Sequence, residues 1–472
     1  MDLHLDLKPG LPLKVAVESA VRTAIRTGRL RAADPLPSTR ALAAQLGVAR
    51  GTVVEAYAQL AAEGWLITRQ GAPARIARGG DGGGSGGSGG DSSPGRPAAA
   101  PAADPVPIPG PYPAAAPVRW DLRPGVPDPS LFPGRAWAAA VRAATHSGAE
   151  VFGYGDPRGR PELRRALTDY LGRARDVLAT PAQTLVTSGF ADGLGLVAGA
   201  LHDLGLRDIA MEDPCLDVHR TVVARAGLTV HPVPVDADGL DITALAATPA
   251  RAVLTTAAHQ FPMGVTLSPA RRRKLVEWAR RVDGYVIEDD YDGEYRFDRK
   301  PVSALQALDP ARVVYGGTAS KALAPAMRLG WLVLPPRLCR PVIDRVARQQ
   351  APPLDQLALA QLIRDGHFDR QVRRTRGEYG RRRDHLVAAG LPLTGIPAGL
   401  HAVLSVPDEK ELIVRARQRS LALLGLAPFW HGPPRTQGVI VGYSRLPRST
   451  VYAALDQLIE LAGGARPGAA RR

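Results

Sequence analysis

Residues 79–117 divide the chain into two parts that must fold separately. Residues 79–90 are nearly all glycine and serine, and residues 94–113 are rich in proline mixed with alanine. The first composition is typical of a flexible coil and the second of a stiffer, extended spacer; neither buries enough apolar surface to fold. We therefore expect a linker between one domain at 1–78 and another at 118–465. A disordered insertion inside a single domain is the alternative.

The bulk properties favour an intracellular protein with an anionic partner. A chain of 472 residues is too long for one hydrophobic core, and a net charge of +15 favours partners such as DNA. Two cysteines in this length fit a reducing compartment, and no Cys or His spacing predicts a metal site. The sequence has no signal-peptide pattern at its start and no apolar stretch of about twenty residues. We expect a soluble, cytoplasmic protein.

The N-terminal part has the pattern of a helix-turn-helix. Helical spacing of apolar residues predicts helices at 13–27, 38–46 and 49–63. Gly47 separates the second helix from the third, as in helix-turn-helix motifs. Two short runs that follow, 65–71 and 74–77, could pair as a hairpin wing.

Polar and basic side chains of this part are candidate DNA contacts. Val53, Tyr57 and Leu60 should face the core, which leaves the basic N-terminal end of the third helix free to enter a major groove. The candidate contacts to phosphates or bases are Arg40, Arg50, Thr52, Arg69 and Gln70. A three-helix domain with ordinary surface arginines is the alternative.

Three motifs of this part resemble a known regulator family. Residues 28–30 (GRL), 36–43 (LPSTRALA) and 46–53 (LGVARGTV) closely resemble the winged helix of GntR-type bacterial regulators. The resemblance covers nearly all of residues 11–78. It implies that Arg40, Arg50 and Thr52 contact operator DNA.

The second part alternates strand-like and helical patterns. Apolar runs at 184–187, 251–256, 285–288 and 312–315 are separated by amphipathic segments such as 271–281. This order predicts an α/β domain with a largely parallel sheet.

Lys321 stands in a setting that suits pyridoxal phosphate (PLP). It ends the run GTASK, Arg328 follows seven residues later, and residues 287–291 (IEDDY) lie upstream. A PLP pocket needs a lysine for the aldehyde, a carboxylate beside the pyridine nitrogen, and a hydroxyl and a cation for the phosphate. Asp289 at a strand end suits the nitrogen, and Thr318 with Arg328 suits the phosphate.

Other parts of this pattern leave alternatives open. Tyr291 could hydrogen-bond the ring hydroxyl, and residues 187–191 (TSGFA) provide a glycine that opens a helix, where anions are favoured. Lys321 could instead be an exposed lysine after a strand. The carboxylates crowded into residues 288–292 could instead hold a divalent cation.

Together these motifs resemble fold-type I aminotransferases from about residue 120 to residue 442. The resemblance implies that Lys321 is the Schiff-base lysine, that Asp289 partners the pyridine nitrogen and that Tyr291 binds the ring oxygen. The residues implied around the phosphate are Gly189, Phe190, Ala191, Thr318 and Arg328. Tyr154 matches a tyrosine that reaches the phosphate of a neighbouring subunit, so the resemblance implies a homodimer.

Further motifs resemble the MocR subfamily, in which a GntR-type winged helix is joined to an aminotransferase-like domain. They are residues 154–159 (YGDPRG), 212–214 (EDP), 259–264 (HQFPMG) and 287–292 (IEDDYD). Some residues depart from these families. Cys215 and Leu216 stand where the subfamily usually has glycine and an aromatic residue, and Ala257 stands where proline is more usual. Phe190 and Asp192 are unusual after residues 187–189, and Phe261 stands where many aminotransferases have asparagine. Arg435 is a candidate for binding a substrate carboxylate.

Three functions are compatible with this organisation. The first is a transcriptional regulator that senses PLP or a PLP–amine adduct and controls vitamin B6 or amine and amino-acid metabolism, with at most vestigial transaminase activity. The second is an active aminotransferase with an accessory DNA-binding domain. The third is a DNA-binding scaffold with a degenerate pocket. The sequence leaves open the effector, the operator and the direction of regulation.

Overall fold

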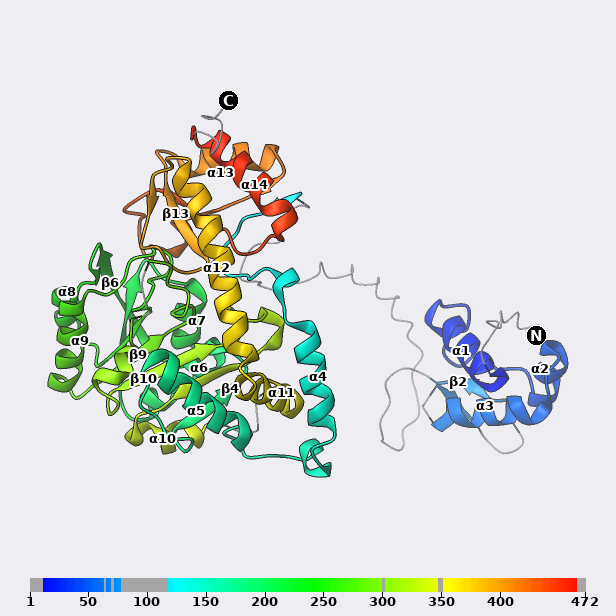
Figure 1. The fold of residues 1–472 in the computed structure, drawn as a ribbon. Coiled ribbons are helices and arrows are strands. Elements are labelled where there is room, and N and C mark those ends of the chain that lie inside the picture. Colours follow the sequence, from blue (N-terminus) through cyan, green and yellow to red (C-terminus); the bar gives the residue numbers. More distant parts are fainter. Residues whose placement is uncertain are drawn as a thin grey trace, which may run out of the picture. The chain divides into compact units, whose positions relative to one another are not determined.

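The computed structural model describes residues 12–62, 65–68, 72–77, 118–298, 302–346 and 351–464. The chain divides into two compact units, residues 1–106 and 107–472, and the division falls inside the predicted linker (Figure 1). Residues 79–117 lie outside the described residues. Within the described ranges, no helix combines the length and the apolar character needed to cross a membrane.

The first unit contains three helices and a small hairpin. Its elements are α1 (Leu13–Arg26), α2 (Thr39–Leu46), α3 (Arg50–Ala62), β1 (Leu66–Ile67) and β2 (Arg75–Ile76). Ser38 caps α2 because its side chain accepts a hydrogen bond from the Ala41 amide, and Gly47 ends α2 with a φ of 65°. The predicted helices are confirmed to within one or two residues at each end, and β1 pairs antiparallel with β2 as the predicted wing.

The core of this unit confirms the predicted inward face of the third helix. Val53, Tyr57 and Leu60 are buried, and they pack with residues of α1, α2 and the hairpin. The Tyr57 hydroxyl donates to the Pro37 carbonyl at 3.1 Å, which fixes the chain just before α2. This packing leaves the N-terminal end of α3 outside the core.

An eight-stranded sheet forms the centre of the second unit. Its order is β4 (Thr184–Thr187), β11 (Gly330–Val333), β10 (Val313–Thr318), β9 (Tyr285–Asp289), β8 (Ala252–Thr255), β5 (Asp208–Asp213), β6 (Thr229–Asp236) and β7 (Gly239–Leu240). The pairs from β10 through β9, β8 and β5 to β6 are parallel, whereas β11 and β7 pair antiparallel with their neighbours. The predicted α/β fold with a mainly parallel sheet is confirmed.

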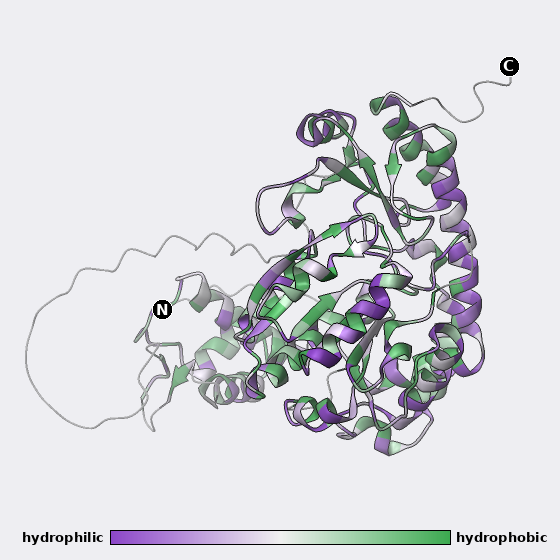
Figure 2. Ribbon diagram, turned by 90° about the vertical axis from the view of Figure 1, so that its left-hand side faces the viewer, coloured by the Kyte–Doolittle hydropathy of each residue, from purple (hydrophilic) through white to green (hydrophobic). Residues whose placement is uncertain are grey.

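Helices cover both faces of this sheet, which explains why its strands are apolar throughout. Ile287 of β9 joins a cluster with α6 (Phe190–Asp203), α7 (Asp217–Arg225) and α10 (Pro336–Ile343). Its neighbour Val286 joins the opposite cluster, with α8 (Ile242–Ala246) and α9 (Pro269–Arg281). Figure 2 shows the central strands mostly in the hydrophobic colour, between helices of mixed character.

A third group of helices packs against the large sheet near β4. These helices are α4 (Gly134–Thr145), α5 (Pro161–Arg175) and α11 (Pro353–Arg364). They contribute to one cluster with residues of β4, β10 and β11.

A smaller lobe is built from the C-terminal part of the chain. Its sheet has the order β12 (Leu393–Thr394), β13 (His401–Ser405), β16 (Gly438–Gly442) and β15 (Leu424–Gly425). The long helix α12 (His367–Ala388) runs from the large sheet to this lobe, which also contains α13 (Glu409–Gln418) and α14 (Arg448–Leu461) (Figure 1). The first strand of the second unit, β3 (Trp120–Asp121), also belongs to this lobe, because it pairs with β14 (Leu421–Ala422).

A buried arginine ties the two ends of this unit together. The Arg382 side chain donates to Asp128 at 2.8 Å and to Glu378 at 3.0 Å. It also donates to the carbonyls of Tyr443, Ser444 and Leu446. The side chains of Arg382 and Asp128 are fully buried, so each charge depends on the other.

We predict that Arg382→Met lowers the free energy of unfolding by about 3–5 kcal/mol, because it leaves Asp128 as a buried, uncompensated charge. Arg340→Met is the matched control, since Arg340 pairs with Asp344 on an exposed helix face and should cost less than about 1 kcal/mol. Urea unfolding followed by circular dichroism measures both. Equal losses in the two variants would contradict this account of the arginine.

Candidate functional site

A cavity of about 240 Å³ opens at the carboxyl ends of the parallel strands. Met211 and Glu212 of β5, Leu254 of β8, Asp289 of β9 and Thr318 of β10 all line it. In parallel sheets ligands bind at this edge, because the strand ends and the loops after them converge there. The cavity therefore lies where the sequence predicted a cofactor site.

The structure brings most of the predicted cofactor residues to this cavity. Those that line it are Gly189, Phe190, Ala191, Asp289, Tyr291, Thr318, Lys321 and Arg328. They come from three segments of the chain that are far apart in sequence, 189–191, 289–291 and 318–328. Their placement at one cavity is compatible with the predicted roles, which stay predictions.

Lys321 follows β10 and points its amine into the cavity wall. Its Nζ donates to the Gly125 carbonyl at 2.7 Å. Burial lowers the pKa of Lys321, and the negative charges of Asp289 and Asp292 oppose that shift. A lysine whose pKa is lowered is neutral more often at a given pH, and a neutral amine is the nucleophilic form.

Asp289 presents a buried oxygen that has no partner. The residue is 5% exposed, and its Oδ1 lacks a hydrogen-bond donor within the described residues. Oδ2 lies 3.9 Å from Nδ1 of His219. Burial raises the pKa of Asp289 well above its usual range, although Lys321 opposes this. A cationic N–H donor at this oxygen would satisfy it and stabilise its charge.

The neighbouring carboxylates do not share a cation site with Asp289. Glu288 accepts hydrogen bonds from the backbone amides of Leu305 and Gln306 at 2.8 and 3.2 Å. Asp290 accepts two hydrogen bonds from Arg175 and one from the Tyr315 hydroxyl. Alternation along β9 turns these two carboxylates away from the cavity. The divalent-cation alternative is therefore disfavoured by the geometry of residues 288–290.

At the predicted phosphate site, Gly189 lies beside the side chain of Arg328. Gly189 precedes α6 with a φ of 100°, and a Cβ at this position would lie 3.3 Å from Nη1 of Arg328. Arg328 also donates to the Ser188 carbonyl. Asp192 accepts the Ser188 amide at 3.1 Å, so its carboxylate serves the start of the helix. The Thr318 hydroxyl lies 3.2 Å from the Leu329 carbonyl and 3.0 Å from the hydroxyl of Ser320.

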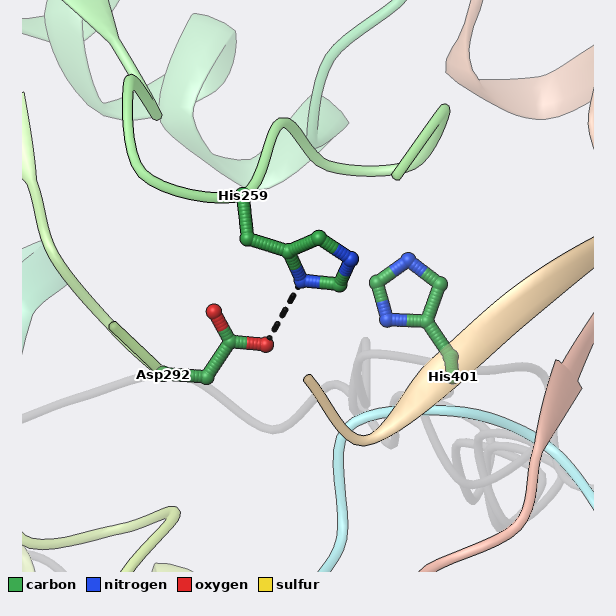
Figure 3. Close-up of side chains that lie close together, drawn as sticks. All are labelled: His259, Asp292 and His401. Atoms are coloured by element: carbon green, nitrogen blue, oxygen red, sulfur yellow. Dashed lines mark hydrogen bonds and ion pairs between the residues drawn. The ribbon is translucent and has the colours of Figure 1, made fainter. Parts of the chain in front are cut away.

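His259, Asp292 and His401 form a buried polar cluster (Figure 3), and the half-buried Tyr291 lies against it. The Tyr291 hydroxyl lies 3.2 Å from Nδ1 of His259, and the same nitrogen lies 2.9 Å from Oδ2 of Asp292. A carboxylate only accepts, so His259 Nδ1 carries the proton in this pair. The ring of His401 lies 5.0 Å from that of His259, centroid to centroid.

Ligand-capable atoms of His259, Asp292 and His401 lie within 4.8 Å of one another. Hydrogen bonds use some atoms of these side chains, whereas Nε2 of His259 and Oδ1 of Asp292 have no partner among the described residues. Asp292 accepts from His259, and His401 Nε2 donates to the Pro262 carbonyl at 3.1 Å. We therefore interpret the cluster as a hydrogen-bonded support for Tyr291.

Three residues around the cavity lie in no motif found from the sequence: Gly125, His219 and His401. Four others, Glu212, Cys215, Thr256 and Ser320, lie in or next to motifs or strands found there, but no cofactor contact was predicted for them. Glu212 is held by the hydroxyls of Thr255 and Thr256, each at 2.6 Å, and by Gln260. Glu212 in the EDP motif, Cys215 after it and Ser320 next to Lys321 therefore had a local signal. Gly125, His219 and His401 reach the cavity only through the packing of distant segments.

The remaining predicted residues lie away from the cavity or outside the described residues. Tyr154 is 98% exposed and does not line the cavity of its own chain. Arg435 is also exposed, 3.9 Å from Asp213 and over the Trp430 ring.

The predicted DNA contacts fall into two groups. Arg40 and Arg50 are exposed at the N-terminal ends of α2 and α3, and Thr52 is half-buried in α3. Arg69 and Gln70 lie outside the described residues.

The residues of the cavity fit PLP on two observations. The unpartnered Oδ1 of Asp289 suits a protonated pyridine nitrogen, and the absence of a Cβ at Gly189 leaves room beside Arg328 for an anion. Lys321 would hold the aldehyde end, and Tyr291 would hydrogen-bond the ring oxygen. When bound, PLP supplies an aldehyde that reacts with primary amines and a ring that withdraws electrons.

Comparisons with known proteins identify both parts. Residues 13–76 match the family of bacterial regulatory proteins called the gntR family, and residues 127–423 match aminotransferase class I and II. An archaeal alanine:glyoxylate aminotransferase has a similar structure, with a TM-score of 0.67 and 22% identity over 74% of this chain and 91% of that one. At that identity the likeness shows the fold.

Full-length relatives share the two-part organisation. The chain is 32% identical to a probable rhizopine catabolism regulatory protein, MocR, of Rhizobium meliloti, over 97% of this chain and 95% of that protein. It is also 32% identical to the pyridoxine biosynthesis transcriptional regulator PdxR of Corynebacterium glutamicum, over 97% and 98%. The chain therefore belongs to the MocR subfamily of GntR-type transcriptional regulators, in which a DNA-binding winged helix precedes an aminotransferase-like domain.

Proposed function

We propose that this regulator is a DNA-bound sensor with domains at 1–78 and 118–465. The winged helix binds operator DNA through Arg40, Arg50 and Thr52, with Arg69 and Gln70 in the wing. The aminotransferase-like domain binds PLP, alone or with an amine. Occupancy of the cavity then changes the DNA-binding behaviour of the chain, in the control of vitamin B6 or amine metabolism.

The observation that carries this proposal is the unsatisfied oxygen of Asp289 beside Lys321. A buried carboxylate oxygen without a hydrogen-bond donor costs free energy. Its presence at the cavity therefore supports a bound ligand that donates a hydrogen bond to it. A protonated pyridine nitrogen is such a partner. The aldehyde of the same molecule suits Lys321, whose nucleophilic form is favoured by burial.

The exposed arginines of the first unit support the DNA-binding role. Arg40 and Arg50 begin two helices of a helix-turn-helix, where a recognition helix meets base edges and phosphates. Tyr57 and Leu60 bury the opposite side of α3. The basic end of this helix is therefore available to a duplex.

A homodimer would complete the site and connect it to DNA. Tyr154 is exposed beside Phe152, which is 66% exposed, so this segment suits contact with a second copy of the chain. We propose that Tyr154 reaches the phosphate site of that copy. Two winged helices in one dimer would bind two half-sites, and a shift between dimer arrangements would change the spacing that they fit.

The first prediction concerns Lys321. Lys321→Ala should abolish the visible absorbance that PLP acquires on covalent binding, because no amine remains for the aldehyde, and should leave basal operator affinity nearly unchanged. Absorbance spectroscopy and fluorescence anisotropy with operator DNA measure the two properties. Lys274→Ala, on an exposed position of α9, is the control and should retain both. Loss of DNA binding by a normally folded Lys321→Ala protein would contradict a separate sensor.

The second prediction concerns Arg50. Arg50→Ala should weaken operator binding by about 1–3 kcal/mol if Arg50 contacts a base, or reduce the salt dependence by about one charge if it contacts a phosphate. PLP uptake should not change. Arg340→Ala removes an exposed arginine from the second unit and controls for the loss of net charge. Equal weakening by both substitutions would show that α3 is not the DNA contact.

The third prediction concerns pH. Asp292 raises the pKa of Lys321, so Asp292→Asn should lower that pKa further and make the neutral amine available at lower pH. The rate of PLP capture, followed by stopped-flow absorbance, should therefore reach half its plateau at a lower pH than in the parent protein. Asp344→Asn, at the exposed C-cap position after α10, should leave the profile in place. A shift toward higher pH would refute the assigned electrostatic coupling.

A further inference from the structure

The cavity has a charged part and an uncharged part. Lys321, Asp289 and Arg328 belong to the predicted cofactor contacts. The uncharged part is lined by Leu216, Val218, Phe261, Leu400 and His401. An amine held beside the cofactor would place its own substituent against a wall of this kind.

Phe261 is the fixed centre of this wall. Its ring packs edge-on against His401 at 5.1 Å and against Phe429 at 5.2 Å, and it lies 6.3 Å from the ring of Tyr291. Phe261 and Leu216 both pack on a buried cluster of Val403, Leu426, Phe429 and Ile440. This packing makes the wall apolar and rigid beside the predicted ring-oxygen contact.

His401 adds a neutral group to this wall. It is 2% exposed, and its Nε2 donates to the Pro262 carbonyl. Burial and the neighbouring His259 lower the pKa of His401 well below its usual range. Figure 3 shows the two imidazole rings side by side.

The arginines near the cavity have other contacts. Arg220 donates to the Phe429 carbonyl at 2.8 Å, and Arg435 lies near Asp213 and over Trp430. Among the described residues that line the cavity, the lysine and arginine are Lys321 and Arg328. Both are assigned to the cofactor under the proposed function.

Resting on the proposed function, we propose that the effector accepted beside PLP is an apolar primary amine without a carboxylate, rather than an amino acid. An alkyl or aromatic group gains from burial against Phe261, Leu216 and Leu400. A carboxylate in the same place would lose its water and meet no further lysine or arginine among the described residues that line the cavity, which is unfavourable. The cavity therefore selects against amino acids by charge.

The test compares pairs of compounds that differ only in the carboxylate. Isoamylamine is paired with leucine, and phenethylamine with phenylalanine, on the full-length chain loaded with PLP. Binding is read as a change in the visible absorbance of the bound cofactor and as a shift in melting temperature. Each amine should act at a concentration at least about tenfold lower than its amino acid. An amino acid that acts as well as its amine, or a lack of response to both, overturns the proposal.

A charge introduced into the wall provides the second arm. Val218 lines the cavity and is 39% exposed, so Val218→Arg can place a guanidinium there without a buried-charge cost. This variant should improve binding of the amino acids relative to the amines by about tenfold. Val387→Arg, at an exposed position of α12, is the matched control and should keep the parent preference. An unchanged preference in Val218→Arg overturns the assignment of the wall.

The experiments distinguish a failure of the proposed function from a failure of the amine preference. A chain that acquires no visible absorbance with PLP would refute both the proposed function and this inference. A chain that binds PLP covalently and responds to amino acids alone would refute only the inference.

Discussion

The effector unit depends on one constraint, the burial of Asp289 at the end of β9. A carboxylate at this depth is costly unless a donor or a positive charge faces it, and one of its oxygens has no donor among the described residues. Lys321 supplies a nearby charge, and its own pKa is lowered by the same burial. The pair of Asp289 and Lys321 therefore suits a cavity that binds a third charged group, one that donates a hydrogen bond to Oδ1 of Asp289.

The surrounding fold separates the charges that would otherwise compete with this pair. Alternation along β9 sends Glu288 and Asp290 to the other face, where backbone amides and Arg175 satisfy them. Asp292, beyond the strand, pairs with His259 through Oδ2, and its Oδ1 has no partner among the described residues. Asp289 is the carboxylate of this acidic run that lines the cavity. Tyr291 reaches the cavity from the segment after β9, and His401 reaches it from the start of β13.

Much of this arrangement could be predicted from local patterns. The strand at 285–288 and the helix at 271–281 were predicted because hydrophobic periodicity depends on near neighbours. Asp289, Thr318, Lys321 and Arg328 could be singled out because each lies just after a predicted strand or in a recognisable motif. His219 and His401 could not, since they reach the cavity from α7 and β13, and nothing local marks a buried histidine as part of a site.

The sequence by itself determined the two-part organisation, the type of each fold and the residues suited to an aldehyde, a ring nitrogen and a phosphate, because glycine, proline and apolar spacing act over short distances. Tertiary structure alone decided which groups meet. It left Oδ1 of Asp289 without a donor, gave Arg220 and Arg435 other contacts, and set Phe261 on an apolar cluster as the wall of the cavity. Such pairings depend on the packing of segments far apart in the chain, which no local pattern specifies.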